Sequence, residues 1–331
     1  MNSLNFPVNS SSNVLKFQQL VDAIINAISS NILNEGDMLP SVNQLMMQSQ
    51  VSRDTVFKAY NELKKRGIVK SVPNRGYFIA ERSSKVFLFL DTFKAYKEVV
   101  FASFRKHLPE TIKVDLHFHH YNIELFESII KESIGRYSKY IIMNFDHPRV
   151  AKIIKQIPEE NLLIIDWKIY ASPSHSYVAQ DFGEPVYDCL KNNLSKIRKY
   201  KEFIFYYPEF TYHPKNAITY FDQFCTEFDI KHRIIYKPED FVVKEGDLYF
   251  LVSDRTLSHF LDQCEENAFE PGNEVGVISY NETPMKKYVK NGISVISTDF
   301  KMMGKKAAEF VTGNEKMTVT IPTTLTLRSS L

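Results

Sequence analysis

The sequence has few cysteines and no long apolar run. Its three cysteines (Cys189, Cys225 and Cys264) are far apart and form no CxxC pair, which argues against a disulfide scaffold and a zinc ribbon. We expect free thiols in a reducing cytoplasm. The longest apolar runs, such as VFLFL and LYFLV, are too short to cross a bilayer. No basic stretch followed by an apolar core opens the chain, so we expect a cytoplasmic protein that does not contact the membrane.

The short motifs of common enzyme classes are also missing. The sequence contains no GxSxG, GxGxxG or GxxxxGK[ST], so nucleophile-elbow, dinucleotide and P-loop chemistry have no support. His117, His119 and His120 could suggest a metal site, but exposed histidines are common and this interpretation is the less favoured one. We therefore expect no enzyme activity, no cofactor and no metal.

Basic residues gather near the amino terminus. Residues 1–80 hold eight Lys/Arg and five Asp/Glu, and seven of these basic residues lie between Arg53 and Arg75. A run such as Lys64-Lys65-Arg66 is usually a solvated helix face. Here the charge coincides with a pattern of helix and turn signals, which favours contact with phosphates.

The helix signals begin at Ser41. Gln44 follows Ser41 at the capping-box spacing, so a helix should run from Val42 to about Gln48. After a turn, Ser52 caps a second helix, and Gly67 is a suitable stop. The apolar positions of this second helix are Val56, Phe57, Tyr60 and Leu63.

A hairpin and an earlier helix complete this region. The runs IVKSV and YFIA, joined by Pro73-Asn74-Arg75-Gly76, predict a hairpin with Arg75 at its tip. Residues 1–13 are polar and are expected to be loosely ordered. A first amphipathic helix is predicted from Phe17, Leu20, Val21, Ile24, Ile25 and Ile28.

This stretch resembles the GntR family of bacterial transcription regulators. The matching pieces are Gly36, Leu39-Pro40-Ser41, Leu45, Val51-Ser52-Arg53, Thr55-Val56, Ala59-Tyr60, Leu63, Gly67-Ile68 and Gly76-Tyr77-Phe78-Ile79. The resemblance implies a winged helix-turn-helix that contacts operator DNA through the first turns of the second helix and the wing tip. The candidate DNA contacts are Ser41, Asn43, Ser52, Arg53, Thr55, Lys58, Asn74, Arg75 and Gly76.

Three positions depart from the family pattern. Asn43 stands where members often carry an arginine, and Phe57 occupies another frequently basic position. Asn74 replaces the first glycine of the usual wing turn, although asparagine tolerates a left-handed backbone better than most residues. The operator sequence of relatives therefore does not transfer to this chain.

Beyond a polar linker at residues 81–85, strand-like runs alternate with helical stretches to residue 331. Such alternation predicts parallel sheets covered by helices on both faces, and the number of strands suggests two units. We expect a winged helix-turn-helix at 1–80 and a two-lobed α/β domain at 86–331. Lobe 1 would span about 86–195 and 297–314, and lobe 2 about 200–294 and 317–331.

Polar and aromatic residues follow several of the predicted strands. In such sheets ligands bind beyond the carboxyl ends of the strands. Carboxylates and amides beside aromatic rings suit a sugar, although Asp and Asn are also favoured as turn residues and caps. Residues of this kind include Asp91, Asn144, Asp146, Asp166, Trp167, Ser253, Asp254, Tyr280 and Asn281.

Residues 86–331 resemble the effector domain of LacI-family repressors, which is related to periplasmic sugar-binding proteins. The landmarks are VFLFLDTFKAYKEVVFASF, YIIMNFDHPRV, IPEENLLIIDW, YVAQDFGEPVYDCL and the segment from DLYFLVSD to STDFKMMGKKAAEFV. The candidate effector contacts are Asp91, Phe93, Tyr96, Asp146, Trp167, Asp181, Ser253, Asp254 and Asn281. An arginine that such domains often place after the fifth strand has no match, and His213 and Lys215 are the candidates to replace it.

A GntR-type reader joined to a LacI-type sensor resembles the arrangement of arabinose-repressor-like regulators. This implies a homodimeric repressor whose DNA affinity changes when a monosaccharide binds in the effector domain. A pentose or deoxyhexose, such as arabinose or fucose, is the first guess by resemblance. The alternatives are a GntR-type reader fused to an enzyme-like domain, a DNA-binding protein with a non-sugar effector, and an architectural DNA binder without a ligand.

Overall fold

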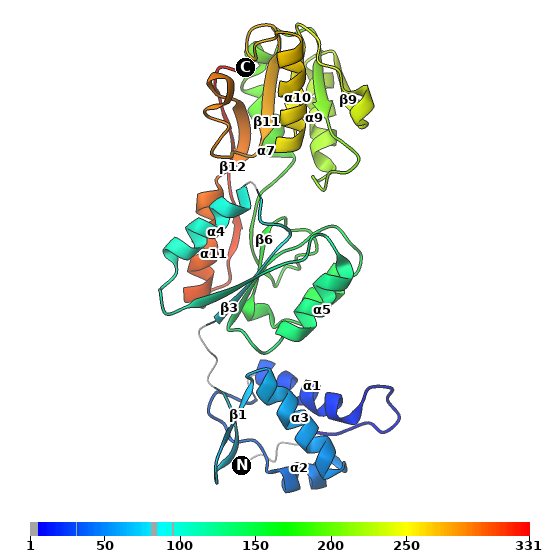
Figure 1. Ribbon diagram of the computed structural model, residues 1–331, viewed down its shortest axis with the longest axis vertical. Helices are drawn as coiled ribbons and strands as arrows, with labels where there is room; N and C mark the ends of the chain where they lie inside the picture. The colour runs from blue at the N-terminus through cyan, green and yellow to red at the C-terminus, as the bar shows by residue number, and fades with distance from the viewer. Residues whose placement is uncertain (1–5, 31, 81–84, 95) are drawn as a thin grey trace.

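The computed structural model describes residues 6–30, 32–80, 85–94 and 96–331. The molecule is elongated, with the amino-terminal helices at one end and two sheet-containing lobes beyond them (Figure 1). Of the expected linker at 81–85, only Lys85 falls among the described residues, and it begins strand β3.

The amino-terminal part, which we call the winged-helix domain, holds three helices and a hairpin. Helix α1 spans Lys16–Ser29, α2 spans Val42–Ser49 and α3 spans Arg53–Lys65. Strands β1 (Val69–Val72) and β2 (Gly76–Ile79) pair antiparallel. These elements confirm the expected winged helix-turn-helix.

The core of the winged-helix domain forms around the apolar stripe of α1. The buried residues that α1 and α3 contribute to this core are Leu20, Val21, Ile24, Ile25, Ala27, Ile28, Val56, Ala59, Tyr60 and Leu63. Phe57, one of the apolar positions predicted for α3, is half-buried, and its ring lies beside the Arg53 guanidinium. The expectation of loose order at residues 1–13 lies outside the described residues for 1–5. It is wrong for Phe6, which is 3% exposed and whose backbone O accepts a hydrogen bond from Ser49 Oγ (2.7 Å).

Lobe 1 is a six-stranded sheet in the order β13-β7-β6-β5-β3-β4, with every neighbouring pair parallel. Its strands are β3 (Lys85–Leu90), β4 (Lys113–Phe118), β5 (Lys139–Met143), β6 (Leu162–Asp166), β7 (Ser176–Ala179) and β13 (Thr318–Thr320). Its helices are α4 (Tyr96–His107), α5 (Ile123–Ser133), α6 (Val150–Ile154) and α11 (Phe300–Thr312), with a short 3-10 turn η1 (Glu159–Asn161).

The run VFLFL in β3 shows why the sequence of a strand in this sheet is apolar at every position. Val86, Leu88 and Leu90 pack on the face covered by α4 and α11. Phe87 and Phe89 point to the opposite face, under α5 and α6. Successive side chains of a strand alternate between faces, so a strand covered on both sides must be apolar at every position.

Lobe 2 is a second six-stranded sheet in the order β14-β12-β11-β10-β8-β9, parallel except for β14, which runs antiparallel to β12. Its strands are β8 (Phe203–Tyr206), β9 (His232–Ile235), β10 (Leu248–Leu251), β11 (Gly276–Tyr280), β12 (Ser294–Thr298) and β14 (Thr323–Thr326). Its helices are α7 (Glu184–Lys191), α8 (Leu194–Ile197), α9 (Asn216–Glu227) and α10 (Asp254–Glu266), with 3-10 turns η2 (Pro238–Asp240) and η3 (Val289–Asn291).

The expected lobe limits do not follow the sheets. Helix α7, placed in lobe 1 by the sequence, packs in the core of lobe 2. Strand β12 belongs wholly to the lobe 2 sheet, and β13, expected in lobe 2, extends the lobe 1 sheet. The alternation of strands and helices cannot show these assignments, because a strand joins the sheet of its pairing partner, which lies far along the chain.

Candidate nucleic-acid interface and effector site

Side-chain caps fix both helices of the helix-turn-helix. Ser41 Oγ accepts from Gln44 N (3.3 Å) while Gln44 Oε1 accepts from Ser41 N (2.8 Å), which completes the predicted capping box. Ser52 Oγ accepts from Thr55 N (3.2 Å) at the start of α3. These caps satisfy backbone donors that would otherwise be free, and they set where the exposed first turn of α3 begins.

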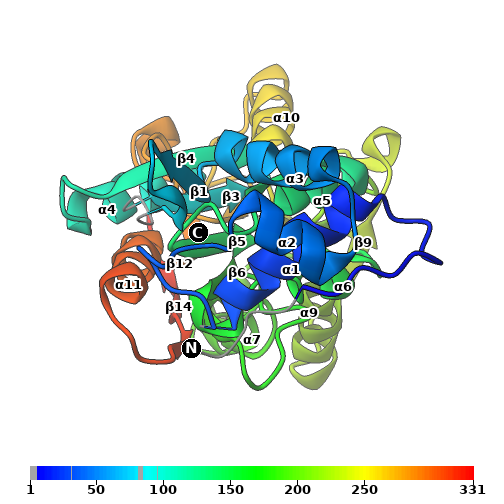
Figure 2. The same cartoon turned by 90° about the horizontal axis from the view of Figure 1, so that it is seen from below.

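The winged-helix domain presents most of the predicted DNA contacts to solvent. Thr55 is half-buried, and the exposed candidates are Ser41, Asn43, Ser52, Arg53, Lys58, Asn74, Arg75 and Gly76. The Arg53 guanidinium lies 5.5 Å from the ring centroid of Phe57, so this aromatic ring supports a charged group on the outer face of α3. Viewed from the winged-helix end, α2 and α3 lie in front of the lobes (Figure 2).

The wing has the geometry that its turn residues predict. Asn74 has φ +60° and Gly76 has φ +106°, so the asparagine does adopt the left-handed conformation. Arg75 N donates to Val72 O (3.0 Å), and the Arg75 side chain is exposed at the tip. The residue expected to reach DNA from the wing therefore stands on a closed turn.

The wing is also tied to the helices. Leu39 N donates to Tyr77 O (2.9 Å) and Ile79 N donates to Asp37 O (2.8 Å), so the Gly-Asp-x-Leu-Pro segment runs alongside β2. Tyr60 OH donates to Pro40 O (2.6 Å), and its ring packs 4.4 Å from that of Tyr77. Helix α3 and the wing are therefore held as one unit.

A second group of polar and aromatic residues lies where the two lobes meet. We call it the interlobe cluster, and its members are Asp91, Tyr96, Tyr121, Asp166, Trp167, Gln180, Phe182, Tyr212, His213 and Tyr280. Most of its lobe 1 members follow the carboxyl ends of strands, the edge of a parallel sheet at which ligands bind.

Two carboxylates anchor the lobe 1 side of the cluster. Asp91 pairs with Lys97 Nζ (3.1 Å) and accepts a hydrogen bond from Tyr121 OH. Asp166 accepts from Tyr96 OH (3.1 Å) and from Gln180 Nε2 (2.6 Å). Burial raises the pKa of Asp166, and the nearby charge of Lys97 opposes this rise. These carboxylates are therefore held rigidly by tyrosine, lysine and amide donors.

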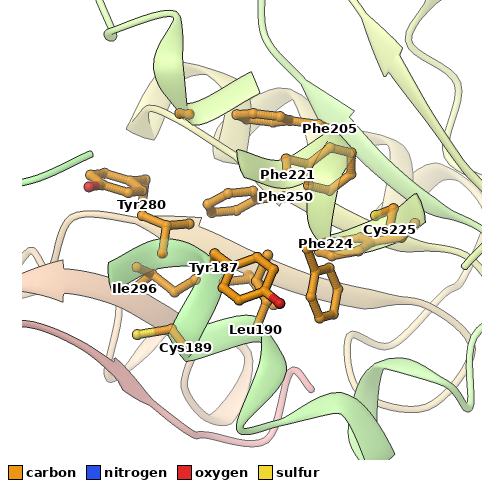
Figure 3. Close-up of a cluster of buried hydrophobic side chains, with 14 of the residues drawn as sticks. Tyr187, Cys189, Leu190, Phe205, Phe221, Phe224, Cys225, Phe250, Tyr280 and Ile296 are labelled. Atoms are coloured by element: carbon orange, nitrogen blue, oxygen red, sulfur yellow. The ribbon is translucent and has the colours of Figure 1, made fainter. Parts of the chain in front are cut away.

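The lobe 2 side contributes buried polar atoms without partners. Among the described residues, Tyr280 OH, His213 Nε2 and Asn281 Oδ1 have no hydrogen-bond partner. His213 packs edge-on against Tyr280 (4.6 Å), and Figure 3 shows the Tyr280 hydroxyl pointing away from the aromatic core of lobe 2. Such groups are costly to bury unpaired, so a ligand with hydroxyls would satisfy them.

The charges of the cluster favour an uncharged hydrogen-bonding ligand. Burial lowers the pKa of His213 to about 3, so its imidazole is neutral at physiological pH. Burial, followed by the charge of Asp166 in the other lobe, raises the pKa of Tyr280. Neutral donors and acceptors from lobe 2 thus lie near a carboxylate from lobe 1. This arrangement can bind hydroxyl groups.

Aromatic contacts join the two lobes directly. Trp167, at the end of β6 in lobe 1, packs against the lobe 2 core with its ring 6.3 Å from that of Phe182. Tyr121 of lobe 1 stacks on Tyr212 of lobe 2 at 3.6 Å. Trp167 is the only tryptophan of the chain, so its fluorescence reports on this junction.

The structure brings together only some of the predicted effector residues. Asp91, Tyr96 and Trp167 lie in the interlobe cluster. Phe93 instead rests on Phe101 (5.6 Å) and is 41% exposed.

The other predicted effector residues mostly make local contacts. Exposed Asp146 accepts from Tyr170 OH (2.7 Å), and Asp181 accepts from Gly183 N (2.8 Å) in the turn before α7. Ser253 caps α10, and Asp254 pairs with Lys286 Nζ (2.9 Å). Asn281, with φ +63°, keeps its buried Oδ1 unpartnered.

Several members of the cluster are not among the candidate effector contacts. The sequence does mark Asp166 and Tyr280 as strand-end residues suited to a sugar, and His213 as a candidate to replace a missing arginine. Tyr121 and Gln180 follow no pattern that distinguishes them. His119 has a structural role: its buried ring bonds Met143 O through Nε2 (2.9 Å).

The winged-helix domain matches a known family. Residues 16–79 match the family described as bacterial regulatory proteins, gntR family. Over 70 residues the chain is 43% identical to YcxD of Bacillus subtilis (strain 168), an uncharacterized HTH-type transcriptional regulator. That match covers 21% of this chain and only 16% of YcxD. The chain thus carries a GntR-type helix-turn-helix domain, and the match does not extend to its other domain.

The two lobes have the fold of LacI-type regulators. A LacI family transcriptional regulator from Silicibacter pomeroyi superposes with a TM-score of 0.63 at 16% identity, covering 75% of this chain and 98% of that one. The trehalose repressor from Escherichia coli gives 0.61 at 13% identity, covering 74% and 100%. At such identities the likeness establishes the fold alone. No helix in the described part of the chain has both the length and the apolar character needed to span a membrane.

Proposed function

We propose that this chain is a ligand-controlled transcription regulator. Its GntR-type domain would bind operator DNA, and a small molecule would bind between the two lobes. Support for the first part comes from the exposed Arg53, Lys58 and Arg75 on a capped helix and a closed wing. The nine candidate contacts named from the sequence remain our proposal for the DNA interface.

The observation that carries the second part is the set of unpartnered buried atoms of Tyr280, His213 and Asn281. All three belong to lobe 2, and Tyr280 lies close enough to the Asp166 carboxylate of lobe 1 for that charge to raise its pKa. The donors already bonded to Asp166 are the neutral Tyr96 and Gln180. A phosphate would meet repulsion from this carboxylate, whereas sugar hydroxyls can both donate to it and accept from neighbours. We therefore propose a neutral monosaccharide, with pentoses and deoxyhexoses such as arabinose and fucose tested first.

We propose a regulatory cycle that uses this geometry. Two copies of the chain would bind a two-fold symmetric operator, because paired helix-turn-helix domains read paired half-sites. Sugar bound to both lobes would favour one interlobe angle and so change the spacing of the two DNA-binding domains. We propose that the sugar lowers operator affinity, as in a repressor released by its inducer.

The test combines three measurements on the full chain. Melting temperature and Trp167 emission are recorded with L-arabinose, L-fucose, D-xylose, D-galactose and their phosphates. One neutral sugar should raise the melting temperature and change the emission, because a ligand of the native state stabilises it. Operator duplexes, selected by the protein from random-sequence DNA, should then bind more weakly with the sugar.

Other outcomes would count against specific parts of the proposal. A response to phosphorylated sugars alone would overturn the neutral-ligand assignment, and no response at all would favour a non-sugar effector. Unchanged operator affinity at saturating sugar would remove the proposed coupling. Failure to select any duplex would overturn the DNA-binding function itself.

A further inference from the structure

Lys286 lies buried beneath the lobe 2 side of the interlobe cluster. The residue is 2% exposed. Its ammonium donates to Tyr280 O (2.9 Å) and Asn281 O (2.6 Å), and it pairs with Asp254 Oδ1 (2.9 Å). An ammonium has three N–H donors, so these three acceptors match its full capacity. Burial lowers the pKa of Lys286, and the charge of Asp254 opposes this effect.

The two carbonyl acceptors belong to the turn that ends β11. Tyr280 is fully buried with its hydroxyl unpartnered, and Asn281 adopts φ +63° with its Oδ1 unpartnered. Beyond Lys286, the turn is held by Asn281 N donating to Ile296 O (2.9 Å) and by Glu282 N donating to Ser297 Oγ (2.8 Å). Asparagine tolerates this left-handed backbone better than most residues, so the turn itself is not strained.

Asp254 extends this support to a second element. It is the first residue of α10, whose N-cap Ser253 accepts from Thr256 N (3.2 Å). The Lys286–Asp254 pair therefore joins the start of α10 to the turn after β11. The ends of β10 and β11 in lobe 2 are thus linked by the Lys286 side chain.

We propose that Lys286 is a positioning residue of the effector site: by holding both carbonyls of the Tyr280–Asn281 turn, it directs Tyr280 OH and Asn281 Oδ1 toward the bound sugar. This inference rests on the proposed function. Stability alone does not account for the residue, because burying an ammonium is costly and an apolar side chain of similar size often serves stability as well. The lysine fixes the backbone that carries Tyr280 OH and Asn281 Oδ1, two side-chain atoms without a hydrogen-bond partner among the described residues.

The test uses Lys286→Met, which keeps the length of the side chain and removes its donors. Hydrogen exchange of the Asn281 and Glu282 amides should accelerate about tenfold or more, since charge-assisted hydrogen bonds to the turn are lost. Affinity for the neutral sugar that stabilises the wild type should fall about tenfold or more. Lys287→Met is the matched control, because Lys287 is exposed beside Tyr288 and should change neither quantity.

A second variant guards against misfolding. Asp254→Asn leaves both carbonyl bonds of Lys286 in place and should shift exchange and sugar affinity in the same direction by a smaller factor. Wild-type exchange in Lys286→Met would overturn the positioning role. Faster exchange with unchanged sugar affinity would show that the turn supports the fold and not the site, and would overturn the inference equally.

Failure of the proposed function can be distinguished from failure of the inference about Lys286. If the wild type responds to none of the sugars, the effector assignment fails whatever Lys286 does. In that case unchanged exchange in Lys286→Met would also reject a positioning role for the lysine, whereas faster exchange limited to residues 279–286 would retain it for another ligand.

Discussion

Tyr121 and Tyr212 stack face to face across the junction of the lobes, with ring centroids 3.6 Å apart and planes 3° from parallel. Tyr121 follows β4 in lobe 1, and its hydroxyl donates to Asp91, which pairs with Lys97. Tyr212 follows β8 in lobe 2 and is 61% exposed. The stack therefore joins the exposed Tyr212 of lobe 2 to the Asp91–Lys97 ion pair of lobe 1 through Tyr121.

The stack should contribute measurable coupling between the lobes. In a double-mutant cycle of Tyr121→Ala and Tyr212→Ala, we expect a coupling free energy of about 0.5–1.5 kcal/mol, the range for aromatic pairs. Urea unfolding of the wild type, both single variants and the double variant gives this value. Tyr212→Phe is the control, because it keeps the ring and should keep the coupling. Additive effects of the two alanine substitutions would mean that the contact between the rings does not stabilise the junction of the lobes.

Removing the Tyr280 hydroxyl should separate stability from ligand binding. Tyr280→Phe deletes an unpartnered buried group, so the free energy of unfolding should stay constant or rise. Tyr140→Phe is the control, since Tyr140 OH donates to Ser133 O (2.7 Å) and its loss should cost about 1 kcal/mol. Sugar affinity should fall in Tyr280→Phe alone. A loss of stability in Tyr280→Phe as large as in Tyr140→Phe would indicate that Tyr280 OH is bonded in the free protein.

Arg53 and Lys58, two of the basic residues of α3, should differ in the part of the DNA that they contact. Arg53→Ala should cost about 1–3 kcal/mol at the selected operator and relax base preference, because the first turn of a recognition helix meets base edges. Lys58→Ala should weaken all duplexes alike and flatten the dependence of log affinity on log salt by about 0.9. Fluorescence anisotropy on selected and scrambled duplexes at several salt concentrations measures both. Equal losses on both duplexes for Arg53→Ala would reduce it to a phosphate contact.

Stability should fall as the pH is lowered from about 6.5 toward 4. Burial lowers the pKa of His119 to about 4, while the unfolded histidine keeps its ordinary value. Between these values the unfolded state binds the extra proton, so acidification from pH 7 to pH 4 should lower the free energy of unfolding by about 3 kcal/mol through this group. The neutral ring already uses Nε2 toward Met143 O, and Nδ1 accepts from Tyr121 N (3.2 Å), which leaves no site for a second proton.

His119→Gln isolates this effect from other groups. The lowered pKa of His213 acts in the same direction, and the raised pKa of Asp166 acts in the opposite one. Urea unfolding at several pH values should therefore show a shallower acid loss in His119→Gln than in the wild type. Parallel curves for the two proteins would show that His119 titrates normally.

Much of the winged-helix domain could be predicted from the sequence, because its signals are local. The capping partners Ser41 and Gln44 are three residues apart, as are Ser52 and Thr55. The left-handed Asn74 and Gly76 likewise act within one turn. Helical spacing also selected the apolar position Phe57, and only the structure shows that this side chain is half-buried.

The effector site was less predictable, because its contacts join residues far apart in the chain. Tyr121 and Tyr212 come into contact only when both lobes have folded and lie side by side. Gln180 Oε1, after β7 of lobe 1, accepts a hydrogen bond from Thr298 Oγ1 at the end of β12 in lobe 2 (2.9 Å). Strand-end residues such as Ser253 and Asp254 fit a cap or a ligand equally well by sequence. In the folded chain Ser253 is the N-cap of α10, and Asp254 forms an ion pair with Lys286.

The sequence by itself determined which elements form and the presence of a DNA-binding motif, because helix caps, turns and alternating apolar runs act over a few residues. Tertiary structure alone decided which lobe receives α7, β12 and β13, and which polar groups were left without partners between the lobes. Those outcomes depend on strand pairing and side-chain burial between residues that are far apart along the chain. Each local sequence pattern is compatible with several partners, and only the folded chain selects one of them.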